Sequence, residues 1–183
     1  MRVALSLAAA AALMTGCGEG RQASPGQETF GPGDLTPAER EAFVYAAVIR
    51  HMTAEEGQSS GFGVIYVLDH AVEGASDPDQ GTGARTPISE EVRIRIQEEL
   101  ATLPPIRFVP DRDEVIGAPA DGSQVENGGI LLTLGPVPEG DRRLEVEASS
   151  YIANLAGTWQ TWILERRGLR WEVTGTTGPV AVS

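Results

Sequence analysis

The side chains best suited to acid–base chemistry are His51, Asp69 and His70. The two histidines are the only ones in the chain, and histidine ordinarily exchanges its proton near neutral pH. A histidine that acts as a general base also needs an acid that orients its ring. If residues 61–72 form one strand, Asp69 and His70 point to opposite faces and cannot pair. We therefore predict no catalytic residue, and we expect these three side chains only as possible members of a pocket.

Asp77 and Asp79 come closest to the pattern of a metal site. They occupy the first and third positions of a segment that partly resembles a calcium-binding loop. The fifth and twelfth positions should supply oxygen ligands, but they are Gly81 and Ile88. We therefore predict no metal and no cofactor, with a calcium-stabilised module as the open alternative.

Several motifs that would indicate an enzyme are missing. The chain has one cysteine and no lysine, which excludes a Cys-x-x-Cys pair, a Ser-x-x-Lys pair and the lysine-containing phosphate loop. Neither histidine begins a His-Glu-x-x-His motif. We therefore expect this protein to work by binding and not by catalysis.

The charge of the chain is strongly negative. It has 26 acidic side chains against 14 basic ones, all arginine, for a net charge of −12. Such a charge repels phosphate backbones, and no basic stripe is present, so we predict no nucleic-acid partner. Anionic lipid headgroups would also be repelled.

The first seventeen residues have the pattern of an export signal. Met1-Arg2 gives a positive start, and residues 3–14 are an apolar run without charge. A membrane-spanning helix needs roughly 20 apolar residues, so this run is too short to span a bilayer. Small residues then precede Cys17, as they do at a signal-peptide cleavage site.

Residues 13–17, Leu-Met-Thr-Gly-Cys, resemble the lipobox of bacterial lipoprotein precursors. The resemblance implies that residues 1–16 are a signal peptide and that Cys17 is acylated. The protein would then be exported and anchored to the cell membrane through this lipid alone. An ordinary secretory signal with an incidental cysteine is the alternative.

Residues 17–35 are expected to form a flexible acylated linker. Residues 18–34 contain five glycines and two prolines among polar residues, with one aromatic side chain, so they cannot bury enough apolar surface to fold. Residues 36–183 have the usual length of one domain. We predict a single α+β domain there.

Two amphipathic helices are predicted in this domain. The first covers residues 37–55, with Thr36 and Glu39 as a capping box and apolar residues at helical spacing. The second begins after Ser89, which is a suitable N-cap, and stops at Pro104-Pro105.

The remaining elements are predicted as strands. Residues 61–72 form a buried strand, residues 73–86 a loop, and residues 106–109 a short strand. An antiparallel meander follows, with one packed face and one wet face, over residues 129–135, 144–151, 158–166, 169–174 and 180–182. Trp159 and Trp162 should lie on opposite faces of their strand.

The expected fold class is α+β, with two amphipathic helices packed on a curved, mainly antiparallel sheet. This order of elements, with a closing aromatic strand at Trp171-Glu172-Val173, is similar to cystatin-like and NTF2-like domains. That resemblance implies a hollow between helix and sheet.

For the function we expect a binding or accessory module of the cell envelope, for which an envelope protein is the candidate partner. The alternative is a small-molecule carrier or an enzyme. Its pocket would lie between the first helix and the sheet, with His51 or His70 titrating there.

Overall fold

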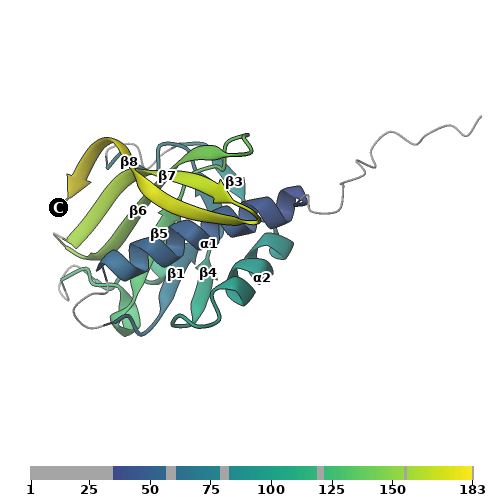
Figure 1. Ribbon diagram of the computed structural model, residues 1–183. Helices are drawn as coiled ribbons and strands as arrows, with labels where there is room; N and C mark the ends of the chain where they lie inside the picture. The colour runs from purple at the N-terminus through teal and green to yellow at the C-terminus, as the bar shows by residue number, and fades with distance from the viewer. Residues whose placement is uncertain (1–34, 57–60, 79–82, 119–121, 155, 183) are drawn as a thin grey trace, which may run out of the picture.

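The computed structural model describes residues 35–56, 61–78, 83–118, 122–154 and 156–182. Within these ranges the chain forms two α-helices, a six-stranded sheet and a two-stranded hairpin (Figure 1). The predicted α+β class is confirmed. The elements are α1 Pro37–Glu56, β1 Ile65–Leu68, β2 His70–Val72, β3 Arg85–Pro87, α2 Glu90–Glu99, β4 Ile106–Val109, β5 Ile130–Leu134, β6 Arg143–Ala153, β7 Ala156–Arg167 and β8 Arg170–Val182.

The six-stranded sheet has the strand order β4-β1-β5-β6-β7-β8. Strand β1 is parallel to both of its neighbours, β4 and β5, because long connections return the chain to the same end of the sheet. Strands β5 to β8 form the predicted antiparallel meander. Because the sheet is curved, α1 contacts both β5, an inner strand of the sheet, and β8, an edge strand.

Both helices begin where the sequence predicts. At α1, the Glu39 amide donates to Thr36 Oγ1 (3.2 Å), and the Thr36 amide donates to Glu39 Oε2 (2.9 Å). The Thr36 amide and the Thr36 hydroxyl both donate to the Glu39 carboxylate (2.9 Å each), which favours its charged form and lowers the pKa of Glu39. At α2, the Val92 amide donates to Ser89 Oγ (3.3 Å). Arg95 then links the two helices through an ion pair with Glu39 (3.2 Å).

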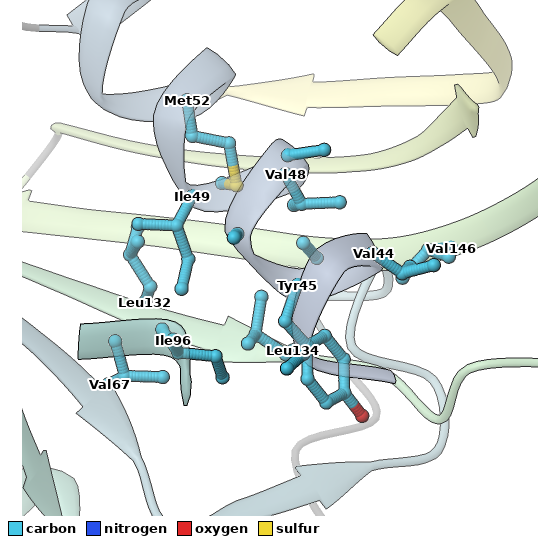
Figure 2. Close-up of a cluster of buried hydrophobic side chains, with 14 of the residues drawn as sticks. Val44, Tyr45, Val48, Ile49, Met52, Val67, Ile96, Leu132, Leu134 and Val146 are labelled. Atoms are coloured by element: carbon cyan, nitrogen blue, oxygen red, sulfur yellow. The ribbon is translucent and has the colours of Figure 1, made fainter. Parts of the chain in front are cut away.

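The interface between the helices and the sheet is filled by apolar side chains (Figure 2). Helix α1 contributes Val48, Ile49 and Met52, each at most 2% exposed, and these pack toward the strands. The same cluster includes Val67, Ile96, Leu132, Leu134, Val146 and Trp162. Tyr45 also belongs to this cluster, and its hydroxyl donates to the Gly135 carbonyl (3.1 Å). Burial of this hydroxyl raises the pKa of Tyr45.

The prediction of one strand over residues 61–72 was wrong. The chain leaves the six-stranded sheet after Leu68, and β2 pairs instead with β3 in the separate hairpin. Asp69 lies at the bend between β1 and β2, and its backbone bonds to segments on both sides. Its amide donates to the Val109 carbonyl (2.9 Å), and its carbonyl accepts from the Ile88 amide (2.9 Å). The predicted loop 73–86 therefore also ends in a strand, β3.

The last two predicted strands are one continuous strand. Strand β8 pairs with β7 along its whole length, with register shifts opposite the Trp159–Thr161 and Ile163–Leu164 steps of β7. The glycines expected to form a turn at residues 175–178 therefore lie among β-bulges, which absorb extra residues without reversing the chain. Pro179 is tolerated because β8 is an edge strand.

The outer face of the sheet is not uniformly wet, in contrast to the prediction. A second apolar cluster covers part of it, formed by Val64, Tyr66, Leu68, Val72, Val109, Val115, Val125 and Leu131. Trp159 and Trp162 do lie on opposite faces. Trp162 is buried in the helix–sheet core, and Trp159 borders a cavity on the outer face.

None of the helices in the described ranges is both long enough and apolar enough to cross a membrane.

Candidate functional site

His51 lies on α1 and contacts the edge of the helix–sheet core. Its ring meets Trp162 in an edge-to-face arrangement, with ring centroids 4.8 Å apart and an interplanar angle of 74°. On the solvent side, His51 Nε2 is 3.1 Å from Glu55 Oε1, one helical turn away. The Trp162 ring and the Glu55 carboxylate therefore fix the orientation of the His51 ring.

Asp69 and His70 form a direct pair, contrary to the prediction that they cannot. His70 Nδ1 is 2.9 Å from Asp69 Oδ1. Side chains alternate only along a regular strand, and the chain bends at Asp69 between the two sheets. That bend places the carboxylate beside the ring of the next residue, in the arrangement that orients a histidine.

His70 is almost completely buried, with 8% of its surface exposed. Because Nδ1 faces a carboxylate, the neutral ring carries its proton on Nδ1 and leaves a lone pair on Nε2. The Nε2 atom is buried and has no hydrogen-bond partner among the described residues. Buried polar atoms usually have such a partner, so this atom marks the pair as a candidate functional centre.

A cavity of about 140 Å³ lies beside His70, between the hairpin and the outer face of the sheet. Three neighbouring positions of the sheet border it: Thr133 on β5 is paired with Ser149 on β6, and Ser149 with Trp159 on β7. The cavity has room for a few water molecules or a small ligand. The polar side chains that border this cavity include the hydroxyls of Thr133 and Ser149 and the charged groups of Asp77, Arg85, Asp111 and Arg112.

A larger hollow lies elsewhere, as an open groove of about 670 Å³ between α1 and the β7–β8 hairpin. Its lining includes the apolar side chains of Phe43, Ala46, Leu169 and Trp171. Leu169, in the hairpin turn, is 50% exposed, whereas Trp171 is 4% exposed. Charged side chains of both signs lie among these residues: Arg50, Glu99, Arg170 and Glu172.

The predicted pocket residues do not come together at one place. Asp69 and His70 lie at the hairpin, whereas His51 lies on α1 against Trp162. Neither histidine borders the large groove. The groove was not predicted, because only the packing of the β7–β8 hairpin against α1 brings residues 43–50 beside residues 169–172.

Residues 79–82 of the partial calcium loop lie outside the described ranges. Among the described residues, no group of three or more His, Cys, Asp and Glu side chains could hold a metal ion.

Residues 57–61, Gly-Gln-Ser-Ser-Gly, have the Gly-x-Ser-x-Gly spacing. In hydrolases this spacing forms a turn from a strand into a helix. Here residues 57–60 lie outside the described ranges, and the elements on either side have the opposite order, with α1 before and β1 after. The spacing therefore does not support a hydrolase.

Comparison with known proteins found no match among protein-family models, curated proteins or solved structures. The narrower resemblance to cystatin-like and NTF2-like domains therefore stays a prediction, and functional arguments must come from the residues themselves.

The two histidines are expected to adopt opposite neutral tautomers. At about pH 9, above the usual titration range of histidine, ¹⁵N ring shifts should show His70 protonated at Nδ1 and His51 at Nε2. These are the atoms that face Asp69 and Glu55. Replacing Asp69→Asn should remove the preference at His70 and leave His51 unchanged. An Nε2-protonated His70 in the wild type would contradict the pairing.

Proposed function

We propose that this protein is a lipid-anchored, exported bacterial protein that works by binding, as an accessory module of the cell envelope. The anchor is inferred from the sequence alone. The positive start, the short apolar run and the small residues before Cys17 support it. These residues lie outside the described ranges.

The filled helix–sheet interface is the observation that favours binding through the surface. A carrier of this architecture would need space between α1 and the sheet, but that region is occupied by buried side chains. The open groove beside α1 is instead accessible from outside and combines apolar with charged side chains. Partly apolar hollows with a polar rim are typical of sites that receive an apolar group of a partner.

A small-ligand site is the second candidate, and the Asp69–His70 pair is the observation that favours it. A buried, carboxylate-oriented histidine beside a cavity is a common feature of sites that bind or convert small molecules. This site would lie at the hairpin and not between α1 and the sheet.

The lipid anchor can be tested by replacing Cys17→Ser. Because the acyl chains attach to this sulfur, the wild type should fractionate with membranes and its N-terminal peptide should begin at a Cys17 with added acyl mass. The variant should lack that mass. A linker variant, Ser24→Ala, is the control and should behave as the wild type does. An unmodified thiol in native material would contradict the proposal.

Binding through the groove can be tested by site-specific photo-crosslinking in intact cells. The crosslinker is placed at Leu169, which borders the groove, or at Ile94 on α2, which is similarly exposed (50% and 47%) but does not border it. We expect an adduct with a discrete envelope protein from position 169 only. Equal adducts at both positions, or none at either, would argue against the groove as the binding surface.

A further inference from the structure

Two arginines face the same hollow as the Asp69–His70 pair. This hollow, of about 390 Å³, is open to solvent and shares His70, Arg85 and Pro110 with the cavity of about 140 Å³. Arg85 comes from β3 and Arg93 from the first turns of α2. The bend at Asp69 brings the hairpin against the helix here, because the Asp69 carbonyl accepts from the Ile88 amide just before α2 (2.9 Å).

Two residues that border this hollow each have a buried nitrogen atom without a hydrogen-bond partner among the described residues. These atoms are His70 Nε2 and Arg93 Nε. The Arg93 guanidinium stacks over the Phe108 ring, with Cζ 5.9 Å from the ring centroid. That contact satisfies its flat face but none of its N–H donors, since hydrogen bonds of guanidinium lie in its plane.

The arginines also lack carboxylate partners. Within the described part of the chain, no Asp or Glu oxygen lies within 4 Å of a nitrogen of Arg85 or Arg93. The one carboxylate in the hollow, Asp69, is directed to His70 Nδ1. In a chain with net charge −12, two arginines without an acid partner form a local positive site.

The neighbouring cavity carries charges of both signs. Arg85 also borders that cavity, together with Asp77, Asp111 and Arg112. The Asp111 carboxylate accepts from the Asp113 amide (3.1 Å) and so caps its own turn. With a neutral His70, the hollow carries the two positive charges of Arg85 and Arg93 and the single negative charge of Asp69.

We propose that this hollow binds a phosphate group, as the free ion or as a monoester. Arginine presents a planar fork of donors that matches phosphate oxygens and is suited to bidentate contact. His70 Nε2, with its lone pair, requires a donor, and a protonated phosphate oxygen supplies one. Sulfate has the same shape and charge but carries no proton near neutral pH, so it would leave Nε2 unpaired. The site does not depend on the lipid anchor or on the groove.

The test is an NMR titration of the full chain in non-ionic detergent, following the His70 ring at constant ionic strength. Inorganic phosphate, glycerol 3-phosphate and sulfate are added in separate arms. We expect saturable shifts with at least one of the phosphates and much weaker ones with sulfate. The stronger of the two phosphates then distinguishes a free ion from a headgroup-like ester.

Variants separate this site from general ion effects. Arg93→Gln should weaken phosphate binding roughly tenfold or more, as expected for loss of a charge-assisted hydrogen bond. Arg107→Gln, an exposed arginine on β4 outside the hollow, should leave binding unchanged. Should Arg93→Gln not fold by circular dichroism, the exposed Arg85→Gln takes its place. The proposal would be overturned if neither phosphate gave a saturable shift, or if sulfate gave an equal response. It would also be overturned if the variant of Arg93, or of Arg85 in its place, bound phosphate as well as the wild type does.

Discussion

The apolar packing of α1 against the curved sheet is the constraint on which the rest of the structure depends. Val48, Ile49 and Met52 are fully enclosed between the helix and the strands, and burial of each such side chain contributes about 1.5–3 kcal/mol. The chain has a single cysteine, so no internal disulfide can supplement this core. Because the interior is filled, polar chemistry is confined to the outer face, the hairpin and the groove beside α1.

The bend at Asp69 connects the core to the candidate small-ligand site. On one side of it, β1 is buried between two parallel strands. On the other side, β2 leaves the sheet and carries His70 to the hairpin. One residue thus orients a histidine with its side chain and links the sheet to the start of α2 with its backbone. The groove and this site lie on different elements, so the two proposed activities can be tested independently.

The helices and the meander could be predicted because their signals are local: capping residues, helical spacing and alternation. The split of residues 61–72 could not, because apolar residues continue on both sides of Asp69-His70 and all seven residues of β1 and β2 are buried. The Asp69–His70 pair was missed for the same reason. The break predicted between residues 174 and 180 was wrong because glycine, as at Gly175 and Gly178, favours both turns and β-bulges. Only the pairing with β7 decides between the two. Arg93 carries no sequence signal, since its surroundings come from distant segments.

The closed helix–sheet core is tested most directly by comparing Ile49→Ala with Ile94→Ala in denaturant unfolding. Both changes occur in a helix, so their effects on helix propensity cancel, but Ile49 is 0% and Ile94 47% exposed. For a filled interface, Ile49→Ala should lower the free energy of unfolding by about 2–5 kcal/mol, and Ile94→Ala should change it by less than about 0.5 kcal/mol. Similar small decreases in the free energy of unfolding for both variants would contradict a closed core. They would favour a ligand pocket between α1 and the sheet.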